Sequence, residues 1–163
     1  MKPILTTMIY CVQANNVLLM LRNKEPNMGL WVGPGGKLEP NESPAECARR
    51  ELNEETGMHA HRLHFRGLVT EISPRADWQW MLFLYVVTEM SGDMVGDERE
   101  GHLRWWPLTN VLQLPIPQAD KIFFPKVIEL SHPFYQAKYL YDDDLKLIEV
   151  IDESGHDASG LAG

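Results

Sequence analysis

The sequence predicts an α+β fold in which a mixed β-sheet is sandwiched between helices, an αβα arrangement. Two observations favour this class: runs of β-favouring residues recur along most of the chain, and strong helix signals occur in only two places. A length of 163 residues without a recognisable linker indicates one domain. We expect this domain to span residues 1–151 and a polar tail to span residues 152–163.

The first predicted element is a β-hairpin. β-Favouring residues fill positions 6–13 and 16–22, and the turn signal Ala-Asn-Asn at positions 14–16 separates the two runs. The following segment, residues 24–36, is rich in Gly, Pro and Asn. It is predicted to be a loop in which the backbone turns sharply or lies close to a ligand.

A helix is expected over residues 44–56. Ser43 is a favourable N-cap, Pro44 suits the first helical position, and Glu46 completes a capping box with Ser43. Gly57 is suited to the left-handed residue that ends a helix. This helix is the strongest local prediction in the chain.

Six more elements are predicted in the rest of the chain. They are strands over residues 61–72 and 78–88, a strand over 103–107, a helix over 120–130, and a strand pair over 136–141 and 145–151. Pro125 interrupts the helical pattern of the second helix. The sum is a mixed sheet with helices packed on it.

Charge and composition exclude several classes of function. The net charge of −8 argues against a nucleic acid polymer as partner, because such binding depends on many Lys and Arg contacts to phosphates. Polar residues interrupt the apolar segment 4–21, so no membrane partner is expected. Cys11 and Cys47 do not make a disulfide framework. We expect a cytoplasmic protein in a reducing compartment.

Three carboxylates gather on one side of the first predicted helix. Glu51, Glu54 and Glu55 are spaced i, i+3 and i+4, which places them on neighbouring parts of one helical face. Such anions repel one another unless a cation lies among them, and hard oxygen ligands suit Mg²⁺ or Mn²⁺. Taken alone, the triplet is more typical of a solvated acidic face that Arg49 and Arg50 neutralise.

The residues around these carboxylates complete a longer pattern. It consists of Gly36, Glu42, Arg50, Glu51, Leu52, Glu54, Glu55, Gly57 and Met58. Seven of these positions require one residue type, whereas Leu52 and Met58 fill apolar positions. If each of the seven fixed residues occurs at roughly 6% of positions, a chance match is on the order of 10⁻⁹ per window. The pattern resembles the Nudix box, and the chain therefore resembles the Nudix hydrolases, which cleave nucleoside diphosphates linked to another group. The resemblance implies the Nudix fold.

The resemblance also implies roles for individual residues. Glu54 and Glu55 are the expected principal metal ligands, with the carbonyl of Gly36 as a further ligand. Glu51 either binds metal or accepts the proton of the attacking water. Arg50 is expected to orient a catalytic Glu, which makes Glu51, Glu54 and Arg50 the catalytic residues within the box.

Two carboxylates outside the triplet are also candidates. Glu42 either belongs to the metal network or pairs with Arg50. A later loop often completes such sites, and residues 97–100 offer Glu100 as a metal ligand and catalytic residue. The alternative for Glu100 is a solvated turn.

Beyond the box, the chain resembles the branch that contains MutT-type enzymes and the oxidised purine nucleoside triphosphatases. Arg22 matches a phosphate-contacting residue of that branch and Asp120 matches a purine-reading one. Val32 and Ala119 are departures, because the branch has Asn and Asp there and their loss removes hydrogen-bond discrimination. The expected substrate-binding residues are Arg22, Trp31, Lys37, Asp120 and Phe123.

The aromatic residues divide into two groups. Trp31, Trp105 and Phe123 are candidates for stacking on a base, with packing in the core as the alternative. Trp78 and Trp80 alternate on a strand and are expected to pack in the core.

The leading functional hypothesis is a Mg²⁺-dependent enzyme, with Mn²⁺ as a possible substitute, that converts a purine nucleoside triphosphate such as 8-oxo-dGTP to its monophosphate and pyrophosphate. The alternative enzyme cleaves ADP-ribose or a nucleoside diphosphate sugar; Pro74 matches a spacing mark of that branch but equally suits a turn. Other hypotheses are a non-catalytic Nudix-fold ligand sensor and, less favoured, removal of an mRNA cap or 5′-triphosphate. A monomer or a homodimer is expected.

Overall fold

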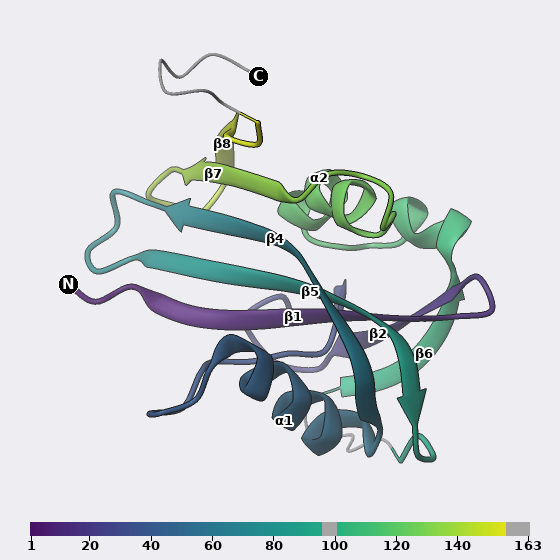
Figure 1. Cartoon of the computed structure of the whole chain (residues 1–163). Helices are drawn as coiled ribbons and strands as arrows, with labels where there is room; N and C mark the ends of the chain where they lie inside the picture. The colour runs from purple at the N-terminus through teal and green to yellow at the C-terminus, as the bar shows by residue number, and fades with distance from the viewer. Residues whose placement is uncertain (96–100, 156–163) are drawn as a thin grey trace.

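The computed structural model describes residues 1–95 and 101–155 (Figure 1). Its elements in chain order are β1 (Ile4–Gln13), β2 (Asn16–Arg22), β3 (Trp31–Val32), α1 (Pro44–Thr56), β4 (His59–Ile72), β5 (Gln79–Ser91), β6 (Gly101–Pro107), the 3-10 helix η1 (Leu108–Gln113), α2 (Gln118–Val127), β7 (Tyr135–Tyr141) and β8 (Leu147–Asp152). Every strand and helix expected from the sequence is present, and the short elements β3 and η1 were not predicted.

The strands of the described residues form one mixed sheet. Its order is β3-β2-β1-β5-β4-β7-β8, and β6 pairs with β2 beside this path. The pairs β1/β5 and β4/β7 are parallel, whereas β1/β2, β4/β5 and β7/β8 are antiparallel. The predicted mixed sheet and the predicted hairpins are therefore confirmed.

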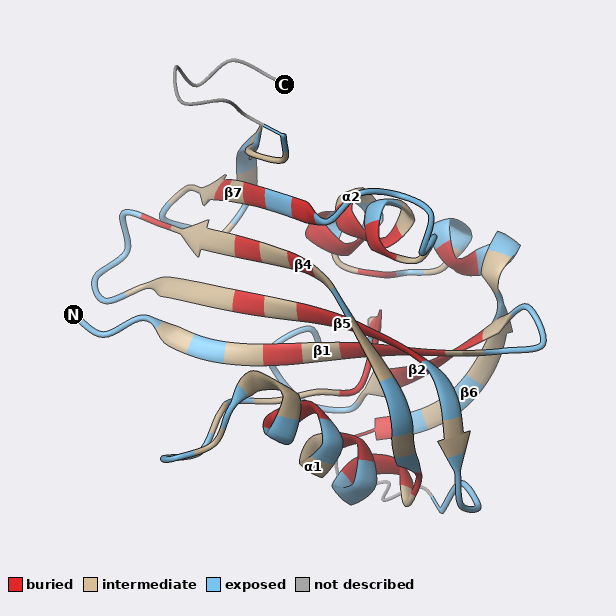
Figure 2. Cartoon of the chain, in the orientation of Figure 1, coloured by how far each residue is buried: buried red, intermediate tan, exposed pale blue. Residues whose placement is uncertain are grey.

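The two helices cover opposite faces of the sheet, with α1 on one side and α2 on the other (Figure 1). Successive strand residues point to opposite faces, so β1 contributes Ile9 to the core under α1 and Tyr10 to the core under α2. Figure 2 shows the buried residues as bands along the central strands and on the facing sides of both helices. The predicted αβα layering is confirmed.

The ends of α1 are fixed as its sequence predicts. The Ser43 hydroxyl accepts a hydrogen bond from the Glu46 amide at 3.1 Å, and the Glu46 carboxylate accepts one from the Ser43 amide at 3.2 Å. Gly57 has a φ of 78° and its amide donates to the carbonyl of Asn53. Leu52 is buried against the sheet in the core under α1, which fixes the face that the helix turns inward.

Several element boundaries differ from the predicted ones by one to three residues. Helix α2 ends at Val127 rather than at position 130 and contains Pro125, which donates no backbone hydrogen bond. Strand β8 begins at Leu147 rather than at Leu145, whose φ of 60° lies outside the strand region. No helix within residues 1–95 and 101–155 is long and apolar enough to cross a membrane.

Candidate active site

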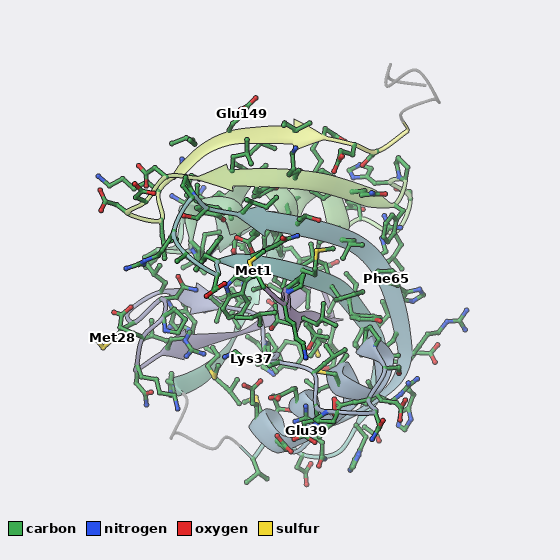
Figure 3. The ribbon with its side chains drawn as sticks, turned by 90° about the vertical axis from the view of Figure 1, so that its left-hand side faces the viewer. Met1, Met28, Lys37, Glu39, Phe65 and Glu149 are labelled. Carbon is green, nitrogen blue, oxygen red and sulfur yellow. The ribbon has the colours of Figure 1, made fainter. Side chains whose placement is uncertain are left out.

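An open cleft of about 1330 Å³ collects most of the residues predicted for the site. It is lined by Arg22, Gly36, Lys37, Glu51, Glu54, Glu55 and Asp120, together with residues of β1, β4 and β5. Figure 3 shows Lys37 and Glu39 on the segment that leads into α1, whereas Glu149 lies at the far end of the same view, on β8. Residues that are far apart in the sequence therefore meet in one cleft.

The glycine-containing loop before α1 lies directly against β1. The Ile9 amide donates to the Pro34 carbonyl at 2.7 Å, and the Thr7 amide donates to the Gly36 carbonyl at 2.8 Å. At Gly35, a β-carbon would lie 2.0 Å from the Thr7 carbonyl oxygen, and the φ of +154° is one that L side chains rarely adopt. Only glycine fits this position, as expected for a loop in close backbone contact.

The three box carboxylates differ in their surroundings. Glu55 is buried, and it accepts a hydrogen bond from the Gly35 amide at 2.8 Å. The Glu51 carboxylate lies beside Gly36, where a β-carbon would come within 2.5 Å of it. Burial raises the pKa of Glu51, while hydrogen bonding to Arg50 opposes the rise. The side chain of Glu54 is 56% exposed.

Arg50 connects these carboxylates to one another. Its guanidinium donates to both oxygens of Glu42, to Glu51 at 2.9 Å and to Glu54 at 3.2 Å. The hydrogen bonds from Arg50 lower the pKa of Glu42. Of the two roles left open for Glu42, the structure shows the pairing with Arg50. Arg49 is exposed.

The donor atoms of the cleft decide which metal ion it could hold. Within residues 1–95 and 101–155, no three His, Cys, Asp or Glu side chains converge on a common point, and Arg50 forms ion pairs with Glu51 and Glu54. Glu51, Glu54 and Glu55 nevertheless line the same cleft and offer only oxygen atoms, which suits a hard divalent cation. These three residues are the ones that fit.

The sequence predicts two further ligands, the Gly36 carbonyl and Glu100. The Gly36 carbonyl already accepts hydrogen bonds from the amide and the hydroxyl of Thr7, so a metal at this oxygen would have to replace one of these donors. Glu100 lies outside the described residues. The three carboxylates of α1 are the expected ligands that the described residues bring to the cleft, and Glu100 stays a prediction.

A second group of acidic residues lies in the cleft, away from Arg50. Asp120 on α2 is 6% exposed, and burial together with the nearby Glu71 charge raises its pKa well above the usual range. The pKa of Glu71 on β4 is also raised by burial, and Tyr141 donates a 2.5 Å hydrogen bond to its carboxylate. Glu71 was not predicted, although it follows Val69 by two positions and so lies on the core face of its strand, an unusual place for a carboxylate.

The aromatic predictions are partly wrong. Phe123 has no exposed surface and Trp31 is 8% exposed, so neither ring face is open to a base, and neither residue lines the cleft. Instead, Trp78 and Trp80 line it, although they were expected to pack in the core. The ammonium of Lys37 lies over the Trp80 ring, 5.5 Å from its centre.

The positions of these aromatic residues follow from strand alternation. Trp80 shares the α2-facing side of β5 with Leu82 and Leu84, and this side opens into the cleft at the end of the strand. Phe123 lies on the inner face of α2, where its ring packs 6.4 Å from that of Tyr139. Trp105 packs on the other side of the sheet, in the core under α1.

Comparison with known protein families gives one assignment: the model of the NUDIX domain matches residues 2–127. The chain belongs to the Nudix family. The box residues that carried the resemblance lie on the loop and helix α1 that line the cleft. The fold predicted from the box is therefore confirmed.

Individual relatives place this Nudix domain more closely. The chain is 34% identical over 114 residues to the uncharacterized Nudix hydrolase YvcI of Bacillus subtilis, a match that covers 68% of this chain and 71% of that protein. It is 35% identical over 99 residues to an 8-oxo-dGTP diphosphatase of Proteus vulgaris, covering 58% of this chain and 87% of the relative. The crystal structure of a MutT protein from Bacillus halodurans matches with a TM-score of 0.83 and 31% identity, over 92% of this chain and 97% of that one. The protein is thus a MutT-like Nudix hydrolase.

Proposed function

We propose that this Nudix hydrolase converts a purine nucleoside triphosphate to its monophosphate and pyrophosphate, with 8-oxo-dGTP as a candidate substrate. The observation that carries the proposal is that one cleft joins the box carboxylates of α1 to Asp120 and the aromatic rings of Trp78 and Trp80. A triphosphate at the carboxylates and a base beside Asp120 would both lie within this cleft. The likeness to the Proteus vulgaris enzyme supports the same substrate class.

The basic residues of the cleft are assigned to the phosphates. Arg22 and Lys37 line the cleft together with the carboxylates. Their positive charge offsets the negative charge of a polyphosphate, which the net charge of −8 would otherwise repel. Arg22 is held in place because its Nε donates to the Pro26 carbonyl at 2.7 Å.

The carboxylates of α1 are assigned to the reaction itself. Glu54 and Glu55 would hold Mg²⁺, or Mn²⁺ in its place, with Glu51 as a further ligand. A bound divalent ion neutralises phosphate charge and lowers the pKa of a bound water. Alternatively, Glu51 acts as the base and accepts the proton of the water that attacks phosphorus. Arg50 orients Glu51 and Glu54 through the hydrogen bonds already described.

A nucleotide panel tests the proposal. The purified protein is incubated in the presence of Mg²⁺ with one nucleotide at a time: 8-oxo-dGTP, dGTP, ATP, ADP-ribose or a nucleoside diphosphate sugar. We expect release of pyrophosphate and a nucleoside monophosphate from a purine triphosphate. Cleavage of ADP-ribose to ribose phosphate, without turnover of any triphosphate, would replace the proposal with the alternative enzyme. The absence of turnover for every nucleotide, with Mg²⁺ and with Mn²⁺, would favour the ligand-sensor hypothesis.

The state and location of the protein remain predictions. Cys11 and Cys47 are both free and buried, which agrees with the reducing, cytoplasmic compartment expected from the sequence. A monomer or a homodimer is still expected. Light scattering of the purified protein distinguishes the two.

A further inference from the structure

We infer that Glu71 on β4 and Asp120 on α2 form a carboxyl pair that reads the base of the nucleotide, and that Glu71 supplies the second acidic group which Ala119 does not. The inference rests on the proposed function, because it assumes a nucleotide in the cleft. It names a specificity residue, Glu71, and a base class: one that presents a ring N–H and an amino group beside a carbonyl, as guanine and 8-oxoguanine do.

The two carboxyls come from different layers of the fold and meet in the cleft. Glu71 belongs to the central sheet, whereas Asp120 lies in the first turn of the helix that covers it. Both line the cleft, and they are close enough for the charge of Glu71 to act on Asp120. The pair is therefore a feature of the tertiary fold.

Three aromatic side chains line the cleft together with the pair. The ring of Tyr141, whose hydroxyl donates to Glu71, lies 5.2 Å from the ring of Trp78. The rings of Trp78 and Trp80 are 6.4 Å apart, and both line the cleft. Flat rings next to hydrogen-bonding groups suit a planar base, because stacking and edge recognition can then act on the same ligand.

The pair lacks the cation that usually accompanies buried acids. In the part of the chain that the structure describes, the ion pairs of Glu42, Glu51 and Glu54 all go to Arg50, and neither Glu71 nor Asp120 forms one. No ion pair among the described residues therefore offsets the cost of burying these two carboxyls. A ligand that donates hydrogen bonds to the two carboxyls would offset this cost.

The lack of an ion pair also determines what the two carboxyls can recognise. Two neighbouring carboxyls do not both ionise readily, so the pair holds a proton and offers one donor with several acceptors. The ring N–H and amino group of a guanine-type base are adjacent donors for one carboxylate, and its carbonyl oxygen accepts from the protonated partner. Adenine has only an amino donor on that edge, so it satisfies fewer of these groups. Val32 contributes no amide, which leaves the base reading to the two acids.

Binding of nucleoside monophosphates tests the inference without metal and without turnover. Isothermal titration calorimetry is carried out with dGMP, 8-oxo-dGMP, dAMP and dCMP on the wild-type protein, Glu71→Gln, Asp120→Asn and Glu149→Gln. Glu71→Gln keeps the size of the side chain, and Glu149 is an exposed acid on β8 that serves as the matched control. Thermal melting of each variant verifies that it is folded.

We expect Glu71→Gln to weaken binding of the guanine-type monophosphates by about 10-fold or more, the size of effect typical of a lost hydrogen bond to a charged group. Binding of dCMP should weaken less, so the ratio of guanine-type to dCMP affinity falls. Asp120→Asn should lower the same ratio, and Glu149→Gln should leave it unchanged. An unchanged ratio in folded Glu71→Gln, or no binding of any monophosphate to the wild type, would overturn the inference.

The two experiments distinguish a failure of this inference from a failure of the proposed function. If the wild type binds a guanine-type monophosphate in a Glu71-dependent manner but releases no pyrophosphate from any triphosphate, the proposed reaction is wrong and the base-reading pair stands. If pyrophosphate is released but the Glu71→Gln affinity ratio equals that of the wild type, the reaction stands and the pair is wrong.

Discussion

The cleft has two acidic regions that use the same side-chain chemistry in opposite ways. In the α1 region, Glu51 and Glu54 share the guanidinium of Arg50, and the side chain of Glu54 is more than half exposed. In the α2 region, Asp120 is buried beside Glu71, and Tyr141 is the group that donates to Glu71. The comparison shows that the neighbours of a carboxylate, rather than its residue type, decide whether it serves as an anion or as a proton-holding group.

The pKa directions express this difference. Hydrogen bonds from Arg50 lower the pKa of Glu42 and oppose the rise that burial causes at Glu51. At Asp120, burial raises the pKa and the charge of Glu71 raises it further. Ionised carboxylates suit a divalent cation, whereas a protonated pair suits the edge of a base. Each prediction below changes one side of this comparison.

The largest effect is expected from Glu54→Gln. The change removes one negative charge from the α1 region while keeping the shape of the side chain, and Glu54 is exposed, so the fold should be retained. We expect pyrophosphate release to fall by about 10²–10⁴-fold, the range typical of a lost catalytic group. The measurement is steady-state turnover of the best nucleotide at saturating Mg²⁺.

The matched control for this prediction is Glu89→Gln. Glu89 is an exposed acid on β5 that does not line the cleft, so turnover should match that of the wild type. Unchanged turnover in Glu54→Gln would remove Glu54 from the mechanism. It would also weaken the assignment of the α1 region to the metal.

The next largest effect is expected from changes at Arg50. Arg50→Gln removes the cation that separates Glu42, Glu51 and Glu54, and we expect turnover to fall by about 10–100-fold, as for other residues that orient metal ligands. Arg50→Lys restores the charge but not the two-pronged contact with Glu42, so it should recover only part of the loss. Full recovery in Arg50→Lys would mean that charge alone matters and that the hydrogen-bond geometry does not.

The α1 region was predictable from the sequence because its signals are local. The cap at Ser43, the left-handed Gly57 and the i, i+3, i+4 spacing of the acids all lie within one short stretch of chain. Helical periodicity alone then places the three carboxylates on one side. The same holds for the hairpins, whose partners are neighbours in the sequence.

The α2 region was not predictable in the same way. Glu71 and Asp120 are brought together by the parallel pairing of β4 with β7 and by the packing of α2 on the sheet, neither of which has a local signal. The aromatic residues show the same limit. Whether Trp80 or Phe123 opens into a cleft depends on where a strand or helix face meets the end of the core, and the residue type does not report this. The hydrogen bonding of the Gly36 carbonyl to Thr7 likewise depends on the docking of the loop on β1.

The smallest effect is expected from Asp120→Asn, measured as stability against pH. A carboxyl whose folded pKa is raised holds its proton in the native state at pH values where the unfolded chain has released it. The free energy of unfolding of the wild type therefore falls as the pH rises from the ordinary pKa of an Asp, about 3.9, to the raised pKa of Asp120. The groups that face Asp120 are Glu71 on β4, Tyr10 on β1 and Tyr141 on β7. The charge of Glu71 disfavours the ionised form of Asp120, whereas both tyrosines stay neutral between pH 4 and pH 8 because burial raises their pKa.

Asn carries no proton to release, so this pH-dependent cost disappears in the variant. We expect the difference in Tm between Asp120→Asn and the wild type to move in favour of the variant from pH 4 to pH 8, by about 2–4 °C for a chain of this length. Glu42→Gln provides the opposite case, because the lowered pKa of Glu42 stabilises the fold above the ordinary range of a Glu and this stability is lost as the pH falls. The Tm of the wild type should therefore increase relative to the Tm of Glu42→Gln as the pH rises. If both variants shifted in the same direction with pH, the two acidic regions would not differ in the way that their surroundings indicate.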